Sequence, residues 1–229
     1  MAGNLSAVEA ETSDFSNVAV PPQARMPRGA LTMAWWAVCS AVFYIVVGAA
    51  MALDPARDWL APQYRELPAM LRHGFPLEHF AMYFMGNPRG GGIPDGVNML
   101  PLQISLAAQI PQAVGVGWGL KLQGSDGVAV AFFGDGASSE GDFHESANLA
   151  GVTKAPVIFF LQDNGWAIST PRRKQTAARS FADRALGYGI HGESVDGNDL
   201  FAVFEVMSRA GALARAGEWA TLRESVTDR

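Results

Sequence analysis

The sequence predicts an α/β protein built on a doubly wound, mostly parallel β-sheet. Two uncharged apolar runs, VAVAFF at 128–133 and PVIFFL at 156–161, are typical of strands buried on both faces. A segment of helical character lies between them, and each run ends in a polar turn that contains glycine. Strands that alternate with helices in this way favour a parallel sheet joined by right-handed crossovers.

The composition is that of a folded globular protein and excludes several classes of function. The 229 residues are 49% hydrophobic and 17% charged, which is enough for one substantial core. A net charge of -5 gives no general reason to expect nucleic-acid binding, and we interpret the basic run at 172–174 as a solvated loop. Cys39 is the only cysteine, so an internal disulfide and a cysteine-based zinc site are excluded.

The N-terminal part of the chain has two distinct segments. Residues 1–29 are polar, and we expect a flexible arm there, followed by a single domain over 30–229 that is truncated at its C-terminus. Residues 30–53 carry no charge, and their length would suffice to cross a bilayer. A buried helix or a subunit interface is the alternative, and the mixed, soluble pattern after Pro55 favours it.

Further elements follow from apolar periodicity and turn residues. The glycine-rich stretch 86–96 is predicted to be a loop, and Thr221–Val226 a last strand. On the final helix we expect Phe201, Phe204 and Met207 to share one side. The predicted helices are Leu77–Met85, Gln109–Leu122, Asp142–Ala150, Ser180–Leu186 and Asp199–Ala216.

Polar side chains follow both predicted buried strands. Gly134–Ala137 (GDGA) comes directly after the first strand, and Gln162–Trp166 (QDNGW) after the second. Ligands of open α/β sheets bind at the C-terminal ends of strands, where glycines let a phosphate approach the backbone. Asp135 beside a phosphate requires a cation, and Mg²⁺ suits carboxylate, amide and phosphate oxygens. Each motif alone is also an ordinary turn signal, so the specificity comes from the pair.

The region around these turns resembles a known family. The stretch GDGASSEGDFHESANLAGVTKAPVIFFLQDNGWAIST closely resembles the α subunit of the pyruvate and branched-chain 2-oxo acid dehydrogenase complexes. The similarity continues through DWLAPQYRE and GVNMLPLQISLAAQIPQAVGVGWGLKLQG upstream, and through KQTAARSF and VDGNDLFAVF downstream, roughly residues 43–229. Within this family, GDG and a following Asn form the thiamine diphosphate-binding motif, so the resemblance implies a fold of that type.

The resemblance implies roles for nine residues, with thiamine diphosphate and Mg²⁺ as cofactors. Mg²⁺ would be bound by the side chains of Asp135 and Asn164 and by the backbone carbonyl of Trp166. The cofactor itself would contact Tyr64, Arg65, Ile104, Leu106, Gly136 and Ala137. From the pattern alone, Ile104 and Leu106 would be core residues. The family resemblance gives no catalytic side chain on this chain.

The implied activity is oxidative decarboxylation of a 2-oxo acid, with pyruvate preferred over a branched-chain substrate, and acyl transfer to a lipoyl group. The implied partners are a β subunit, which supplies an activating glutamate within an assembly of two α and two β chains, and a lipoyl-bearing acyltransferase component. A bacterial cytoplasm is the expected location. The alternatives are a degenerate or truncated scaffold subunit, a protein anchored through residues 30–53, and a nicotinamide-dependent enzyme suggested only by Gly115–Gly119.

The sequence departs from the family pattern at several positions. Asp163 replaces the first residue of the family's Asn-Asn pair, and this extra carboxylate could repel the diphosphate or strengthen metal binding. Gln162 stands where some relatives carry an arginine directed at phosphate. The chain stops before a regulatory loop whose histidine contacts cofactor and substrate in relatives. We interpret His73, His79, His144 and His191 as packing or capping residues rather than catalytic ones.

Overall fold

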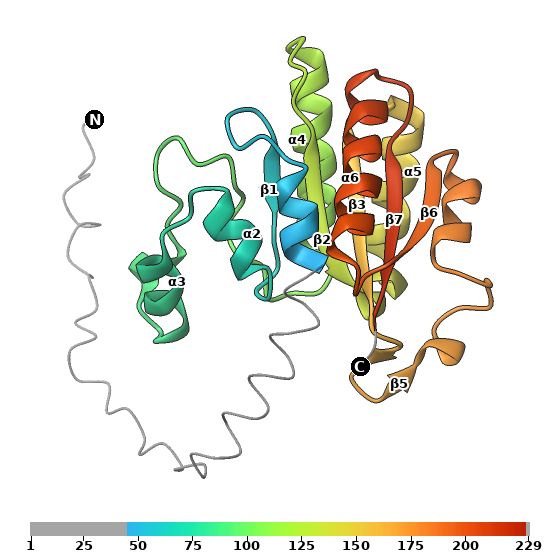
Figure 1. The fold of residues 1–229 in the computed structure, drawn as a ribbon, viewed down its shortest axis with the longest axis horizontal. Helices are drawn as coiled ribbons and strands as arrows, with labels where there is room; N and C mark the ends of the chain where they lie inside the picture. The colour runs from blue at the N-terminus through green and yellow to red at the C-terminus, as the bar shows by residue number, and fades with distance from the viewer. Residues whose placement is uncertain (1–44, 228–229) are drawn as a thin grey trace, which may run out of the picture. The chain divides into compact units, whose positions relative to one another are not determined.

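The computed structural model describes residues 45–227 and has a parallel five-stranded sheet at its centre (Figure 1). The strand order is β1-β2-β3-β7-β6, and every pairing is parallel. The strands are β1 (Trp59–Ala61), β2 (Ala129–Gly134), β3 (Val157–Asp163), β6 (His191–Asp196) and β7 (Thr221–Val226). The predicted α/β class with a mostly parallel sheet is therefore confirmed.

Helices cover both faces of the sheet, as a parallel sheet requires. On one face lie α4 (Gln109–Leu122), α5 (Gly141–Thr153) and the 3-10 turn η5 (Ala182–Tyr188). The other face is covered by α6 (Leu200–Arg215), α2 (Leu67–Arg72) and the helical residues 45–51. The remaining elements are α3 (Leu77–Phe84), η2 (Pro88–Gly91), η3 (Asp135–Ser139), β4 (Trp166–Ala167), β5 (Thr170–Pro171) and η4 (Arg172–Lys174).

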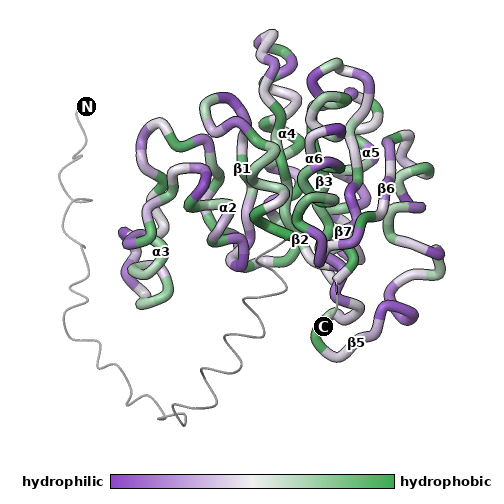
Figure 2. Tube along the Cα trace, viewed as in Figure 1, coloured by the Kyte–Doolittle hydropathy of each residue, from purple (hydrophilic) through white to green (hydrophobic). Residues whose placement is uncertain are grey.

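The strands β2 and β3 present apolar side chains to both faces of the sheet, so both faces are covered by helices. Successive side chains of a strand point to opposite faces. Accordingly, Phe133 and Phe159 belong to the core under α4 and α5, whereas Phe132 and Phe160 belong to the core under α6. All four side chains are fully buried, and Figure 2 shows the hydrophobic colour concentrated along these strands. Burying each phenylalanine contributes roughly 1.5–3 kcal/mol relative to leaving it exposed.

The end of the uncharged run at 30–53 forms part of the second core. Ile45, Val46 and Ala49 are at most 1% exposed, and they pack with residues of α6. A side chain at Gly48 would lie 2.7 Å from the carbonyl oxygen of Leu200, so this helix approaches the start of α6 closely. Among residues 45–227, no helix is long and apolar enough to span a membrane. Residues 30–44 of the run, like the arm predicted at 1–29, lie outside the described residues.

Most of the predicted elements are confirmed with small shifts at their ends. The helix at 109–122 and the strand at 221–226 have the predicted bounds. The helix expected at 180–186 is a 3-10 helix instead. The expected side of α6 is wrong: Phe201 is 79% exposed, and the buried side holds Val203 and Met207. Positions 203, 207, 210 and 214 follow the helical period, so the helix turns its smaller side chains to the sheet.

Candidate functional site

The two glycine-containing turns meet at one edge of the sheet. Gly134 pairs with Gln162 in the register of β2 and β3, so Asp135 and Asp163 follow at the same level on neighbouring strands. The turn η3 begins at Asp135, which is only 4% exposed. A β-carbon at Gly136 would lie 2.8 Å from Cβ of Ala167, so η3 lies directly against the hairpin that follows β3. This confirms that the predicted turns lie side by side.

Only one of the two carboxylate oxygens of Asp135 accepts a hydrogen bond from the described residues. Gln175 Nε2 donates a hydrogen bond of 2.7 Å to Oδ2 of Asp135. The hydroxyl of Ser138 donates to the backbone oxygen of Asp135 at 2.6 Å, which fixes the turn from within. Among the described residues no donor contacts Oδ1 of Asp135, so this oxygen can serve as a ligand for a cation.

Asn164 and Trp166 lie in the turn after β3. The side-chain oxygen of Asn164 accepts a hydrogen bond of 3.1 Å from the backbone N–H of Trp166. An amide oxygen has two lone pairs, so this bond leaves one for a second partner. The chain then folds back through the antiparallel pair β4 and β5 over η3. The ligand roles of Asn164 and of the Trp166 carbonyl remain predictions.

Tyr64 and Arg65 lie at the same edge because a buried acid holds their loop there. They follow β1, which pairs with β2. The carboxylate of Glu66 accepts hydrogen bonds from the backbone N–H groups of Gln63 and Arg65, at 3.0 and 3.1 Å. Its other oxygen accepts a bond of 3.0 Å from Gln162 Nε2. Gln162 therefore anchors this loop to β3, and Arg65 stays exposed, with its guanidinium carbon 5.4 Å from the Tyr64 ring centre.

The carboxyl group of Glu66 has a raised pKa because it is buried. Glu66 is 2% exposed, and burial raises the pKa of its carboxyl group above the ordinary 4.5. The hydrogen bond from Gln162 and those from the backbone oppose this shift but do not cancel it. The group that fixes the Tyr64–Arg65 loop is therefore one whose charge is costly to bury.

Ile104 and Leu106 are not core residues. Their side chains are 56% and 48% exposed, so the interpretation drawn from the apolar pattern alone is wrong. They precede α4, whose first residue Gln109 donates from Nε2 to the backbone oxygen of Phe132 at 2.6 Å. Between them and α4, Ala107 is buried with a φ of 65°, a conformation that is rare for residues other than glycine. Both exposed side chains therefore precede a strained turn anchored beside the end of β2.

The extra carboxylate of Asp163 is paired. Its Oδ1 accepts a hydrogen bond of 2.8 Å from the backbone N–H of Gly165, and its Oδ2 lies 3.0 Å from Nη1 of Arg172. Burial raises the pKa of Asp163, while Gly165 and Arg172 lower it and the nearby charges of Asp135 and Glu224 raise it. Because its charge faces Arg172, Asp163 is not an isolated negative charge beside the expected diphosphate.

Sequence reasoning missed Arg184 and Gln175 altogether. Arg184 Nη1 donates to the carbonyl and hydroxyl oxygens of Ser138 at 2.7 and 3.0 Å. Its Nη2 donates to the backbone oxygen of Gln175 at 3.1 Å, and its Nε to the hydroxyl of Thr176 at 3.3 Å. No motif marks either residue, because these contacts depend on how the segment 165–184 folds back over η3.

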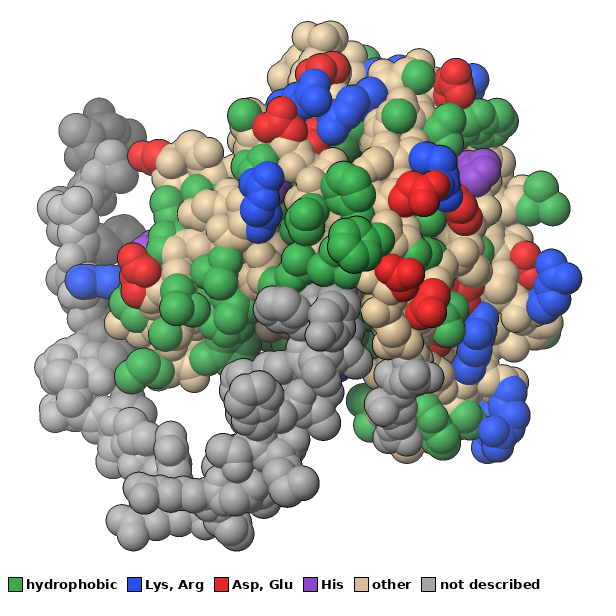
Figure 3. Space-filling model, viewed as in Figure 1, with side chains coloured by type: hydrophobic (Ala, Val, Ile, Leu, Met, Phe, Trp, Pro, Cys, Tyr) green, Lys and Arg blue, Asp and Glu red, His purple; other side chains and the backbone are tan. Residues whose placement is uncertain are grey.

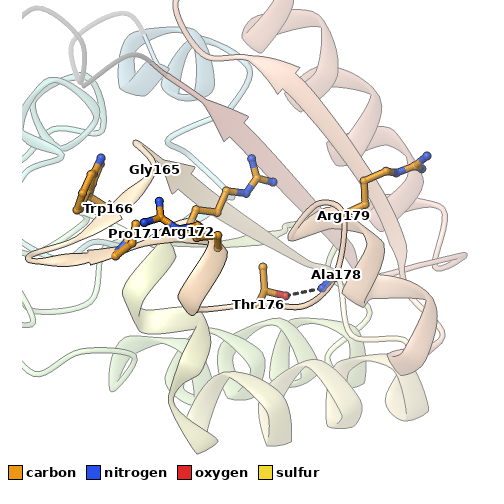
Figure 4. Close-up of a pocket in the computed structure, with 8 residues that line it drawn as sticks. Gly165, Trp166, Pro171, Arg172, Thr176, Ala178 and Arg179 are labelled. Atoms are coloured by element: carbon orange, nitrogen blue, oxygen red, sulfur yellow. Dashed lines mark hydrogen bonds between the residues drawn. The ribbon is translucent and has the colours of Figure 1, made fainter.

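A cavity of about 530 Å³ adjoins this region and shares Gly165 and Trp166 with the turn after β3 (Figure 4). Trp166 and Arg179 lie toward opposite ends of it in this view. Trp166 is the only predicted site residue in its lining, and Asp135, Tyr64 and Ile104 do not contribute, so the cavity overlaps the predicted site only at its edge. Its lining is Gly165, Trp166, Pro171, Arg172, Arg173, Thr176, Ala178 and Arg179.

The four histidines have protein partners. His73 Nε2 contacts the backbone oxygen of Asp58 at 2.8 Å, and His79 Nδ1 contacts that of Gly92 at 2.9 Å. His144 bonds to the hydroxyl of Tyr188, and His191 lies beside Arg223. Within residues 45–227, no three His, Cys, Asp or Glu side chains are grouped to hold a metal ion. Figure 3 shows basic and acidic side chains interspersed on the visible face, without a continuous basic surface.

Comparison with known proteins identifies the family. Residues 38–229 match the family described as dehydrogenase E1 component. The pyruvate dehydrogenase E1 component subunit alpha of Staphylococcus aureus (strain Mu50) is 46% identical over 172 residues, which cover 75% of this chain and 46% of that protein. The protein of the same description from Staphylococcus epidermidis (strain RP62A) is 45% identical over 174 residues, covering 76% and 47%.

A solved structure shows the same fold at low sequence similarity. It is an enzyme from Mycobacterium smegmatis described as thiamin diphosphate-dependent, with a TM-score of 0.52 and 16% identity. The match covers 81% of this chain and 31% of that one. The chain itself spans about half the length of the curated relatives that it matches, 46% and 47% of the two Staphylococcus proteins. The agreement of family, relatives and fold leads to one conclusion: the chain belongs to the dehydrogenase E1 component family.

Proposed function

We propose that this chain is the α subunit of the decarboxylating component of a 2-oxo acid dehydrogenase complex, with pyruvate as the preferred substrate and a branched-chain 2-oxo acid as the alternative. The observation that carries the proposal is the pair of turns at one sheet edge, with buried Asp135 directly after β2 and Asn164 directly after β3. The relatives named as pyruvate dehydrogenase E1 subunits support the same assignment.

The residues at this edge fit a magnesium-bound diphosphate. Mg²⁺ prefers oxygen ligands and usually takes one or two carboxylates together with phosphate oxygens and water. Asp135 offers a carboxylate oxygen without a donor, and Asn164 offers an amide oxygen with a free lone pair. A β-carbon at Gly136 would lie 2.8 Å from Cβ of Ala167, so the packing of η3 against the hairpin leaves no room for a side chain at this position. Gly136 and Ala137 are proposed to contact the diphosphate there.

Thiamine diphosphate supplies the carbon that attacks the 2-oxo group and the ring that accepts electrons when carbon dioxide leaves. The residues of this chain bind and orient it. Arg65 presents a planar, exposed guanidinium suited to phosphate oxygens, and Glu66 fixes the backbone beside it. Ile104 and Leu106 offer exposed apolar surface for the thiamine rings. As the family resemblance implies, we assign the activating proton transfer to a glutamate of the proposed β subunit.

The remaining parts of the proposal follow the family. A β subunit supplies the activating glutamate within an assembly of two α and two β chains, and a lipoyl-bearing acyltransferase component accepts the acyl group. The relatives come from bacteria, which supports a bacterial cytoplasm as the location. If the chain binds no cofactor even with its partner, a degenerate scaffold subunit becomes the better account.

Calorimetric titration of thiamine diphosphate tests the proposal. It is carried out with and without Mg²⁺, with and without a cognate β subunit, and on an Asp135→Ala variant. We expect binding that requires Mg²⁺ and is lost in the variant. A requirement for the β subunit would place the site between the subunits. Absence of binding with a β subunit that is competent with a full-length α chain would overturn the proposal for this chain.

A further inference from the structure

The candidate metal ligand Asp135 and three further residues form a closed ring of hydrogen bonds. The backbone oxygen of Asp135 accepts from the hydroxyl of Ser138, and Ser138 accepts twice from Arg184. Arg184 donates in turn to the backbone oxygen of Gln175, whose side chain donates to the carboxylate of Asp135. The ring therefore holds both the backbone and the carboxylate of the same residue. It connects η3 with Gln175, directly after η4, and with Arg184 in η5, which lie 40 and 46 residues later in the chain.

The orientation of the Gln175 amide is fixed by its surroundings. Its Nε2 faces two oxygens, Oδ2 of Asp135 at 2.7 Å and the backbone oxygen of Thr170 at 3.0 Å. Exchanging the nitrogen and oxygen of the amide would place oxygen against both acceptors. Gln175 is thus a donor to Asp135, and it occupies one of the two carboxylate oxygens.

Arg184 has the shape that the ring needs. Its guanidinium reaches four acceptors on three residues, Ser138, Gln175 and Thr176, and lies 4.9 Å from the ring centre of Phe181. A planar fork can span such a set, whereas a lysine ammonium acts as a point donor. Arg184 therefore closes the ring in a way that charge alone could not.

We propose that Gln175 and Arg184 are positioning residues that hold Asp135 ready for one-oxygen coordination of the divalent cation. This inference rests on the proposed function. Gln175 keeps Oδ2 engaged and turns Oδ1 toward the cation, and Arg184 holds Gln175 and η3 together. Partners that orient metal ligands typically change metal affinity by about 10- to 100-fold when they are removed.

The test uses the full chain in three variants and two measurements. Gln175→Leu removes the amide that donates to Asp135. Arg184→Lys keeps the positive charge but removes the planar guanidinium. Gln123→Leu is the control, because it makes the same Gln-to-Leu change at an exposed position after α4. Binding of Mn²⁺ in the presence of thiamine diphosphate is followed by the electron paramagnetic resonance signal of free Mn²⁺. Hydrogen exchange of the peptide covering 133–143 is measured on each protein without cofactor.

We expect Gln175→Leu to weaken Mn²⁺ binding at least about tenfold, Arg184→Lys to weaken it less, and Gln123→Leu to leave it unchanged. Exchange at 133–143 should become faster in the first two variants only. Wild-type affinity for Mn²⁺ in Gln175→Leu would overturn the inference. If the wild-type chain binds no Mn²⁺ even with a competent β subunit, the proposed function fails for this chain. Hydrogen exchange alone then decides the ring: faster exchange in Gln175→Leu and Arg184→Lys supports it, and unchanged exchange overturns it.

Discussion

Arg172 Nη2 donates a hydrogen bond of 2.5 Å to Oε1 of Glu224, an acid that is fully buried on β7. The same carboxylate accepts from the hydroxyl of Ser194 and from the backbone N–H groups of Phe181 and Ala182. Arg172 also pairs with Asp163, so one guanidinium connects the turn after β3 with the interior of the sheet. It offsets two buried negative charges at the candidate site.

Replacing Arg172 by Met should destabilise the folded chain by about 3 kcal/mol, because it leaves the charges of Asp163 and Glu224 buried without their partner. The free energy of unfolding is measured by urea denaturation. Lys174→Met is the matched control, since this cation is exposed and only two residues away. The control should stay within about 0.5 kcal/mol of wild type. Equal effects of the two substitutions would contradict this role of Arg172.

Glu66→Gln should reduce the dependence of stability on pH. Burial raises the pKa of Glu66, so the folded chain binds this proton more tightly than the unfolded chain does. Its contribution to stability is fully present below the unfolded pKa, near 4.5, and is lost as pH rises through the folded pKa. The glutamine keeps an acceptor for the Gln63 and Arg65 backbone without that loss.

The comparison with wild type isolates Glu66 from Asp163, whose pKa is also raised. Urea unfolding of both proteins is followed from pH 4.5 upward, and the difference in free energy of unfolding is plotted against pH. We expect the variant to gain stability relative to wild type as pH rises. A difference in free energy of unfolding that does not change with pH would contradict the raised pKa of Glu66.

Gly136→Ala should abolish close contact between η3 and the β4–β5 hairpin. The new methyl group would lie 2.8 Å from Cβ of Ala167, so one segment must move, at a cost of about 1–3 kcal/mol. Gly141→Ala, outside the GDG motif, is the control, because the nearest atom to its added β-carbon is Oε1 of the Glu145 side chain at 3.8 Å. Thiamine diphosphate affinity with Mg²⁺ should fall about tenfold or more only at position 136. Similar affinities of both variants would disprove the steric argument.

Ile104→Ser and Leu106→Ser should affect binding rather than stability. Their side chains are exposed, so each change should alter the free energy of unfolding by no more than about 0.5 kcal/mol. If they contact the thiamine rings, cofactor affinity measured by calorimetry should fall in both. Ile110→Ala, at a fully buried position on α4, should instead lose about 2–5 kcal/mol of stability. If Ile104→Ser lost stability but kept the wild-type affinity for the cofactor, Ile104 would be a core residue and not a cofactor contact.

The sequence predicts the centre of the sheet better than its edges. Uninterrupted apolar runs mark β2 and β3, whereas β7 reads TLRESV and has β-branched residues only at its two ends. β1 has three residues and stops before Pro62, which is too short for a periodic pattern. β6 reads HGESVD, and its polar residues hide a strand that only the pairing with β7 reveals.

The candidate site shows the same division. Asp135 and Asn164 could be placed together because neighbouring parallel strands end at one edge. The contact of Gln175 with Asp135 could not be predicted, because it depends on the path of an irregular loop. The apolar pattern wrongly predicted a core position for Ile104. An apolar residue type does not distinguish the core from a surface that another molecule covers.

The polar sequence of β6 has a consequence beyond its effect on prediction. Among the described residues no strand pairs with its outer side, so it is an open edge of the sheet. Open edges invite strands of other chains and so lead to aggregation, and charged side chains oppose that addition. His191, Glu193 and Asp196 put polar and charged groups along this edge, and Glu193 is tied to Arg209 and Arg223. We therefore expect this edge to resist self-association at concentrations where an apolar edge would seed fibres.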